Sequence, residues 1–519
     1  MPRRKIQKTL LNKEFFMFGL EQIYFQLILL GVFIVASVVG YLVIKNVPSL
    51  LHTPLMSGMN ALSGVTVLGA LTAAAVLFKA NIILSAVLGA IAIALAMVNV
   101  VGGFMVTDRM LGMIAKKKPK NNGLIYFIAI ILAAAILALT VMMGMGIGNG
   151  ELLYIISAAA LSIGVLVGIA MMSKVAISKI GNRVSAIAML LAIVMTIVYN
   201  GIGTVWTMYL GLALGAIFGG VLAVKVKMIQ MPQLVALLNG LGGAASALVG
   251  AFAMAGIGSG FDTFSKITAA LALAVGMITL TGSLVAAGKL HKVLPQKSIV
   301  YKGHQLWTIL SLVVTLVGMI AYIILAKEGA PLYIAGGIAI VAIFSGFFGF
   351  IFSIRVGGAD MPITISLLNS FSGVAGSIAG LAINDLLLVA VGGIVGASGL
   401  LLTQIMCKAM NRSLSSILLG KTSAPAPAPA KAPEKAAEKK AEPAPAPVVE
   451  EINYAAELMK AKDVIIVPGY GMAIAQAQHL VKKLADKLVA NGAKVRYAVH
   501  PVAGRMPGHM NVLLCEANV

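Results

Sequence analysis

The stretch MPQLVALLNGLGGAASALVG, residues 231–250, contains no charged side chain. A helix of about 20 residues crosses the roughly 30 Å hydrocarbon core of a bilayer, so this stretch predicts a membrane-spanning helix. It also holds one amide, Asn239, among closely spaced small residues. Small residues let membrane helices approach closely, and an intramembrane amide usually faces the interior of a helix bundle.

The whole chain has the same apolar character. Its 519 residues are 60% hydrophobic and 11% charged, with a mean hydropathy of +1.00, which excludes an ordinary soluble globular protein. The formal net charge of +22 does not predict a nucleic-acid partner, because the cations lie between apolar runs and set membrane topology. The two cysteines, Cys407 and Cys515, cannot build a disulfide framework, and we expect no metal centre.

Apolar runs long enough to span a bilayer recur along the chain, so we expect a polytopic α-helical membrane protein. We count about thirteen spans, near 23–44, 51–78, 82–106, 124–146, 151–172, 184–199, 203–224, 231–254, 267–288, 306–326, 331–354, 362–383 and 386–406.

Alternate loops carry the cations, from KKKPK at 116–120 to Lys408 and Arg412, and the positive-inside rule places those loops in the cytoplasm. The loops between them, such as GIGNGE at 146–151, are nearly uncharged. An odd number of spans then puts the basic start of the chain on the outside. Either one span near the N-terminus is miscounted, or KTLLNKEFF (8–16) lies flat in the membrane interface. No cleavage site follows the first apolar run, so a signal peptide is not expected.

A soluble region follows the last span. Residues 421–451 are Ala/Pro/Lys/Glu-rich and predict a solvated, semi-rigid linker. Beyond it, the pattern predicts a strand (463–467), a helix (about 472–490) and a second strand (495–499), the start of an α/β Rossmann-like domain.

A glycine turn, Gly469-x-Gly471, joins the first strand to the helix, as in loops that bring a backbone close to a pyrophosphate. Ile474 occupies the third glycine position, so a plain turn without a ligand stays open. No acidic residue ends the second strand, whereas Arg496 and Arg505 lie nearby, which favours NADP over NAD. A nucleotide-binding domain of this kind needs five or six strands, so we expect its C-terminal portion to be missing.

The first stretch is repeated within the chain as MPITISLLNSFSGVAGSIAG at 361–380. The repeat places Asn369 where Asn239 lies in the first copy. Each amide could simply bridge two helices. Their recurrence at one place in a repeat favours a polar path through the bundle instead.

These motifs resemble those of the proton-translocating NAD(P) transhydrogenases. HTPLMSGMNALSG (52–64) and GGFMVTDRML (102–111) are similar to the membrane portion of the alpha subunit. MPQLVALLN, LTGSLVAAGKL (280–290), GGADMPITISLLNSFSG (357–373) and IMCKAMNRS (405–413) are similar to that of the beta subunit. PGYGMAIAQAQH (468–479) and HPVAGRMPGHMNVLL (500–514) resemble the NADP-binding domain III.

The resemblance implies five segments: an alpha-type membrane region (1–120), a linking helix (121–150), a beta-type proton-translocating region (151–420), the linker (421–451) and an incomplete domain III (452–519). NAD(H) would bind a separate alpha subunit carrying domain I, and the complete complex would form a homodimer. The resemblance also implies a multi-pass protein of a bacterial inner membrane with the nucleotide-binding domain in the cytoplasm.

The family's reaction passes a hydride from NADH to NADP while a proton crosses the membrane inward. By resemblance, Asn369, Ser283 and Asp360 lie on the proton path. The residues implied for NADP(H) are Gly469, Tyr470, Gly471, Met472, Ala473, His500, Val502, Ala503, Gly504, Arg505, Met506, Pro507 and Gly508.

Many family members have a histidine where this chain has Asn239, and members lacking it tend to carry the equivalent of His52. We therefore expect His52 to titrate on the proton path. It could instead cap a helix start beside Thr53-Pro54. A rival interpretation of the chain is a secondary transporter or channel with a nucleotide-sensing domain.

Overall fold

The computed structural model describes residues 2–45, 47–80, 85–114, 123–227, 230–258, 261–327, 329–358, 360–410, 413–418, 457–458, 460–475, 477–500, 503–504 and 508–519. Within these ranges, thirteen helices are long and apolar enough to cross a membrane, as the sequence predicts. The protein is a polytopic α-helical membrane protein. The linker expected at 421–451 lies outside the described residues.

The membrane helices follow one another along the chain with short connections. Their bounds are α1 (Pro2–Val43), α2 (His52–Ser63), α3 (Thr66–Ala80), α5 (Ala90–Ile114), α6 (Gly123–Gly144), α7 (Gly150–Met172), α8 (Ser178–Tyr199), α9 (Trp206–Lys225), α10 (Met231–Met254), α11 (Thr263–Leu290), α12 (His304–Leu325), α13 (Pro331–Ile354), α14 (Met361–Ile383) and α15 (Leu386–Ala409). Helices α2 and α3 form one span. Short helices lie at Ser49–Leu51, Ser85–Gly89, Val175–Ile177 and, as α16, at Leu414–Leu418.

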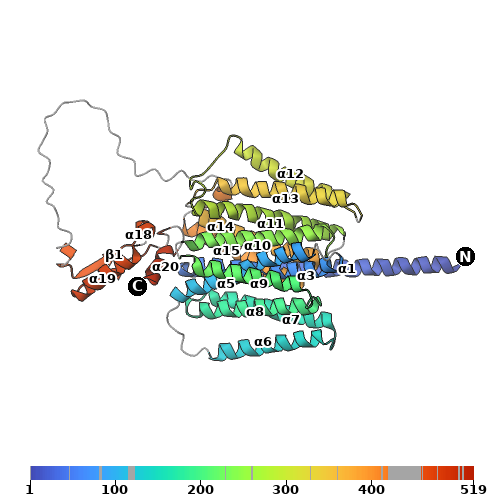
Figure 1. Ribbon diagram of the computed structural model, residues 1–519, viewed down its shortest axis with the longest axis horizontal. Coiled ribbons are helices and arrows are strands. Elements are labelled where there is room, and N and C mark those ends of the chain that lie inside the picture. Colours follow the sequence, from blue (N-terminus) through green and yellow to red (C-terminus); the bar gives the residue numbers. More distant parts are fainter. Residues whose placement is uncertain are drawn as a thin grey trace.

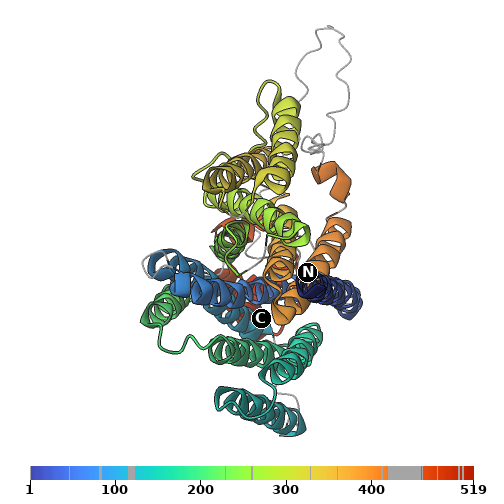
Figure 2. The ribbon, with the colours of Figure 1, turned by 90° about the vertical axis from the view of Figure 1, so that its right-hand side faces the viewer.

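The bundle has a buried centre and a lipid-facing rim. Of the residues in the most apolar window of the span His52–Leu77, 89% are buried, whereas only 11% are buried in Tyr126–Gly144. Helices α2, α3, α10, α14 and α15 pack together in the centre, while α12 with α13 and α6 with α7 and α8 flank it on opposite sides (Figure 2). A polar path can exist only in the centre, because lipid offers no hydrogen-bond partners.

The two ends of the bundle differ in charge. The α/β unit lies at one end, here called the α/β end, and the N-terminus projects from the opposite, far end (Figure 1). Alternation of the helices places the cationic loops at the α/β end, where the described members include Lys174, Lys179, Lys225, Lys227, Lys292, Lys297, Arg355 and Lys408. Helix α1 runs unbroken from Pro2 to Val43, so the segment 8–16 is continuous with the first span, Ile23–Val43, and forms no separate helix.

Two predicted span boundaries were wrong. The span expected at 184–199 begins at Ser178, and the span expected at 82–106 ends at Ile114. Both helices continue through charged residues, because Asp108 on α5 forms ion pairs with Lys179 and Arg183 on α8. Paired charges at the end of a span cost less to hold near the membrane than isolated ones.

The α/β unit contains two parallel strands, β1 (Asp463–Ile466) and β2 (Lys494–Tyr497), with Asp463 opposite Lys494. Two helices, α18 (Tyr470–Ala475) and α19 (Gln478–Ala490), connect the strands, where the sequence predicts one continuous helix. A last helix, α20 (His509–Glu516), packs against α18 and α19 and also lies against α5 of the bundle.

Glycines set how closely α10 and α11 approach. A Cβ on Gly276 would lie 2.6 Å from the backbone nitrogen of Ala247, whereas a Cβ on Gly336 of α13 would meet no atom within 4 Å. We expect Gly276→Val to destabilise the protein by about 1–3 kcal/mol, because the two helices must separate. Gly336→Val is the control with little change. Thermal unfolding in detergent measures both, and equal melting temperatures for the two variants would contradict the packing argument.

Candidate proton path and nucleotide turn

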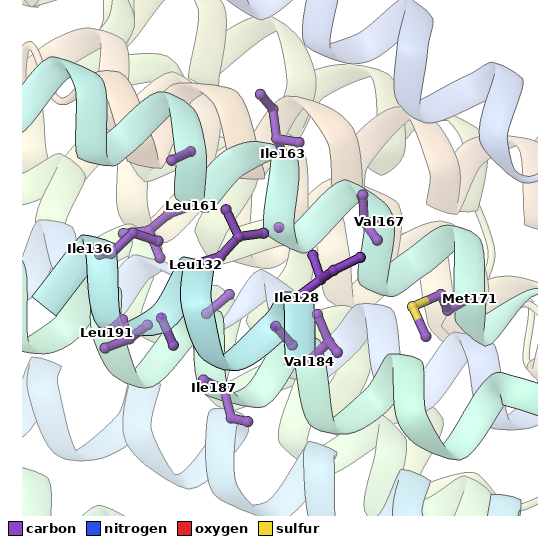
Figure 3. A pocket seen from close by; sticks show the side chains of 15 residues that line it. Ile128, Leu132, Ile136, Leu161, Ile163, Val167, Met171, Val184, Ile187 and Leu191 are labelled. Atoms are coloured by element: carbon purple, nitrogen blue, oxygen red, sulfur yellow. The ribbon is translucent and has the colours of Figure 1, made fainter. Parts of the chain in front are cut away.

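The bundle holds an apolar cavity of about 440 Å³ between α6, α7 and α8, lined by fifteen apolar residues, among them Leu132, Leu161 and Ile187 (Figure 3). None of these side chains can donate a hydrogen bond or titrate, and the Met171 thioether is at most a weak acceptor. The chemistry of the bundle must therefore lie elsewhere.

The structure brings several of the sequence-predicted polar residues together in the centre. The Asn239 amide nitrogen on α10 donates a hydrogen bond to the Ser283 hydroxyl on α11, at 2.9 Å. The Asn369 amide nitrogen on α14 donates to the carbonyl oxygen of Met56 on α2, at 3.1 Å. All three polar side chains are at most 1% exposed. The two copies of the sequence repeat thus place their amides in the same core, each bonded to a different helix.

His52 is the first residue of α2 and is 3% exposed. Its Nε2 lies 3.3 Å from the Val47 carbonyl oxygen, and its Nδ1 has no partner among the described residues. When Nε2 donates that hydrogen bond, the lone pair of Nδ1 stays available for a proton. His52 is the first residue of α2 and Leu51 is its N-cap, so the His52 side chain bonds to the carbonyl of a residue that precedes the helix.

Asp360 is 4% exposed and precedes α14 at the α/β end. The carbonyl oxygen of Asp360 accepts from the backbone of Ile363, and its side chain makes no cap hydrogen bond. Asp360 therefore lies about two and a half helical turns from Asn369 along the same helix, toward the basic loops.

Sequence reasoning missed a second polar group in the middle of the bundle. The Asn99 amide nitrogen on α5 and the Ser372 hydroxyl on α14 both donate to the Ser63 hydroxyl on α2, at 3.3 and 3.2 Å. Ser63 in turn donates to the Asn60 carbonyl oxygen at 2.8 Å. The signal was present, since Asn60 and Ser63 lie three residues apart and share a helix face in the motif HTPLMSGMNALSG.

The four core asparagines share one feature. Each amide nitrogen has a partner, whereas each Oδ1 is buried without a hydrogen-bond partner in the described portion of the chain; they are Asn60, Asn99, Asn239 and Asn369. Buried polar atoms are almost always satisfied, and internal water commonly supplies the missing bond. Four acceptors left open in one core indicate a place for bound water. We call Asn60, Ser63, Asn99, Asn239, Ser283, Asn369 and Ser372 the polar column.

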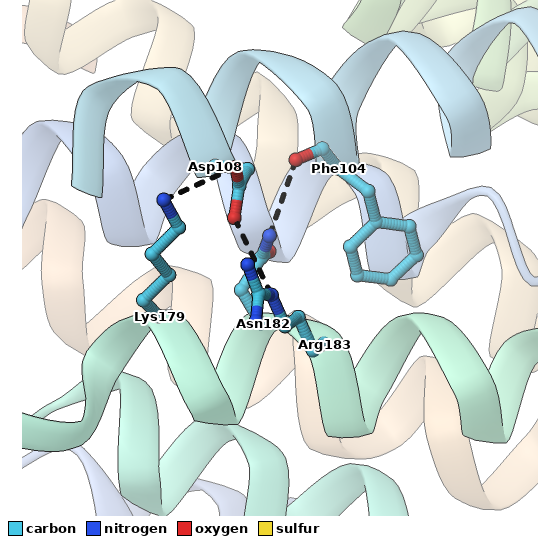
Figure 4. Close-up of polar contacts among 5 residues, drawn as sticks. All are labelled: Phe104, Asp108, Lys179, Asn182 and Arg183. Atoms are coloured by element: carbon cyan, nitrogen blue, oxygen red, sulfur yellow. Dashed lines mark hydrogen bonds and ion pairs between the residues drawn. The ribbon is translucent and has the colours of Figure 1, made fainter. Parts of the chain in front are cut away.

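A charged cluster lies at the α/β end of α5. Figure 4 shows Asp108 between Lys179 at 3.6 Å and Arg183 at 4.0 Å, with Asn182 donating to the Phe104 carbonyl oxygen at 3.2 Å. These contacts fix α5 to α8, and α5 is also the helix against which α20 of the α/β unit lies.

The nucleotide turn is open to solvent. A Cβ added to Gly469 or Gly471 would meet no atom within 4 Å, so this face of the turn has room for a ligand. Tyr470, Met472 and Ala473 pack with Ala503 in a small apolar cluster that also contains Met510 and Leu513. The cluster brings the PGYGMA and HPVAG motifs together.

The remaining residues of the second motif are only partly described. Gly504 and Gly508 have φ values of +111° and +76°, conformations that glycine adopts without strain. His500 is exposed. Val502, Arg505, Met506 and Pro507 lie outside the described residues. The Arg496 guanidinium donates to the Asp463 carboxylate at 2.7 Å, so this arginine already has an anionic partner.

Comparison with known proteins gives matches along most of the chain. Residues 153–519 match the family model of the NAD(P) transhydrogenase beta subunit, and residues 29–116 match that of the 4TM region of pyridine nucleotide transhydrogenase. The chain is 40% identical to NAD(P) transhydrogenase subunit beta of Rhodospirillum rubrum over 347 residues, which cover 65% of this chain and 72% of that protein.

Another relative matches a shorter part of the chain. In Rickettsia prowazekii, the second portion of the NAD(P) transhydrogenase subunit alpha is 45% identical over 85 residues, 16% of this chain and 63% of that protein. Since the beta-subunit model covers well over half of the chain, and the helices it covers build much of the buried polar core, the chain belongs to the proton-translocating NAD(P) transhydrogenases, as a membrane component of the beta-subunit type.

Proposed function

We propose that the polar column is the route by which protons cross the bundle, and that the α/β unit binds NADP(H). In this proposal, hydride passes from NADH to NADP⁺ while a proton moves from the far end to the α/β end, and NADPH is formed. The matches to both an alpha and a beta subunit support an alpha-type region at 1–120, a linking helix at 121–150 and a beta-type region at 151–420. Residues 452–519 would begin domain III.

The observation that carries the proposal is the set of four open amide oxygens in the polar column. An amide has no accessible pKa, so the column can hold water but cannot store a proton. His52 can, because an imidazole has an ordinary pKa near 6.5. Its Nδ1 has no hydrogen-bond partner in the described chain, and α2 carries it one turn from the Met56 carbonyl that holds Asn369. His52 is therefore the proton carrier and the amides are its hydration sites.

The distribution of charge supports the orientation of the chain in the membrane. Cationic loops gather at the α/β end, which supports a cytoplasmic location for that end in a bacterial inner membrane. A proton that moves inward, toward the negative side, releases about 2.3 kcal/mol of free energy per 100 mV of membrane potential. The NAD⁺/NADH and NADP⁺/NADPH couples have nearly equal potentials. This energy therefore shifts the hydride exchange toward NADPH.

Partners follow from the same chemistry. Hydride transfer needs a second nucleotide site for NAD(H), which we assign to a separate alpha subunit carrying domain I. The resemblance to the family further supports a homodimer of the complete complex in the lipid bilayer.

The test is a proteoliposome assay with the chain assembled with its NAD-binding alpha subunit. At a fixed ratio of NADH to NAD⁺, imposing a potential of about 100 mV, positive at the far end, should raise the equilibrium ratio of NADPH to NADP⁺ by roughly 50-fold per proton moved. An uncoupling ionophore should abolish the shift. A transporter or channel would instead conduct protons without nucleotides, and a potential-independent ratio would refute the proposed coupling.

A further inference from the structure

A second cavity lies at the far end of the bundle, about 200 Å³ in volume, between α1, α3, α7, α8 and the connection from α14 to α15. Water occupies about 30 Å³ per molecule, so the cavity has room for roughly six. Unlike the cavity of Figure 3, this one is lined by titratable and polar groups: Glu151, Tyr154, Tyr199, Asn200, Asn384 and Asp385.

Asp385 is the buried acid of this cavity, with 5% of its surface exposed. Its Oδ1 accepts hydrogen bonds from the Tyr154 hydroxyl at 3.1 Å and from the Leu388 backbone nitrogen at 2.9 Å. Burial raises the pKa of the Asp385 carboxyl above its ordinary value, against the lowering effect of these hydrogen bonds. The carboxyl can therefore bind a proton at a pH at which an exposed aspartate would stay ionised.

The groups that face Asp385 come from several helices. Helix α7 contributes Glu151 and Tyr154, and α8 contributes Tyr199, whose ring stacks on that of Tyr154 with the centroids 4.2 Å apart. The side chains of Phe25 on α1 and Thr72 on α3 do not titrate. Among the described residues that line the cavity there is no lysine, arginine or histidine.

Helix α3, which lines the cavity through Thr72, runs from there toward the polar column. The Asn200 amide nitrogen donates to the Thr72 hydroxyl at 3.3 Å. Thr66 lies six residues deeper on α3, about 9 Å along the helix. Its buried hydroxyl has no partner among the described residues, and α2 ends three residues before it, at Ser63 of the column.

We propose that this cavity is the proton-loading site of the membrane path and that Asp385 is the group that takes up the proton. A hydronium ion in the cavity donates its proton to the Asp385 carboxylate and becomes water, and the neutral carboxyl passes the same proton through water toward Thr72. The inference rests on the proposed function, because it places the entrance of the proton route at the end opposite the nucleotide domain.

The decisive variant is Asp385→Asn in the complete complex in proteoliposomes. The amide oxygen can still cap α15, as Asn149 caps α7 in this protein, but it cannot carry a proton. We expect the initial rate of proton translocation, followed with a pH-sensitive dye, to fall by about tenfold or more and to lose its dependence on the pH at the far end. Asp385→Glu should retain both.

The matched control is Asp262→Asn. Asp262 also lies at the far end and also caps a helix, α11, by accepting from the Ser265 nitrogen, but it is not among the described residues that line the second cavity. This variant should translocate protons like the unaltered complex. If Asp385→Asn translocates at a rate within about twofold of the unaltered complex and with the same pH profile, the inference is wrong.

Tyr154→Phe gives a second measurement that does not depend on how Asp385→Asn folds. The tyrosine hydroxyl stabilises the ionised carboxylate, so its removal raises the pKa of Asp385 and should move the half-maximal pH upward. An unchanged midpoint in a complex that binds NADP(H) normally would also overturn the inference. If the unaltered complex itself moves no protons, the proposed function fails instead.

Discussion

His52→Ala should abolish proton pumping and the formation of NADPH that depends on it. His52 is a buried imidazole one helical turn from Met56, whose carbonyl accepts from Asn369 of the polar column. Its removal leaves amides and hydroxyls in the column, which cannot store a proton at neutral pH. We expect a loss of roughly 100-fold or more in dye-reported translocation by the complete complex in proteoliposomes, while NADP(H) binding in detergent stays unchanged.

The chain supplies a matched control for this variant. His304 is also buried, at 6% exposure, its Nε2 lies 3.1 Å from the Ile351 carbonyl oxygen, and its Nδ1 has no partner in the described chain. It lies on α12 at the rim, away from the column. His304→Ala should therefore pump normally, which separates the loss of a titrating group on the path from the loss of any buried histidine.

A second-site change tests the same idea from the other direction. Asn239→His restores a titrating group next to Ser283 and should partly rescue pumping in the His52→Ala background. Normal pumping by His52→Ala alone would mean that the proton does not use the imidazole. The hydrogen bond of His52 to Val47 would then only fix the start of α2.

The second large effect is expected at the nucleotide turn. Gly471→Val adds a side chain where the structure has open space, so the fold should tolerate it. A dinucleotide lying over the turn would lose that space. We expect NADP⁺ binding to weaken by about 100-fold, close to 2.7 kcal/mol, with unchanged thermal unfolding.

Ala475→Val serves as the control, because Ala475 is exposed at the other end of the same short helix and also becomes a valine. It should bind NADP⁺ normally. Titrations of the detergent-solubilised chain, without the NAD-binding alpha subunit, with NADP⁺ and NAD⁺ measure the effect. Equal affinity for both dinucleotides would contradict the assignment of the unit to NADP(H).

The number of spans and the asymmetry of the two ends could be predicted from the sequence. A bilayer fixes the length of an apolar helix, and loop cations fix its direction, so both properties are local along the chain. The repeat of Asn239 and Asn369 likewise predicted buried amides, because a polar side chain in an apolar span is more stable facing the bundle interior than the lipid. The two span boundaries failed where Asp108 pairs with Lys179, a contact that hydropathy cannot register.

Tertiary structure alone decided which polar residues meet. Asn99 and Ser372 both bond to Ser63, from positions 36 and 309 residues away along the chain, and Tyr154 bonds to Asp385 across 231 residues. No periodicity in the sequence encodes such pairs, because each depends on how several helices rotate about their axes until small residues pack and buried polar atoms find partners. The sequence by itself determined that a polar interior must exist, and the packing of the helices determined where it runs.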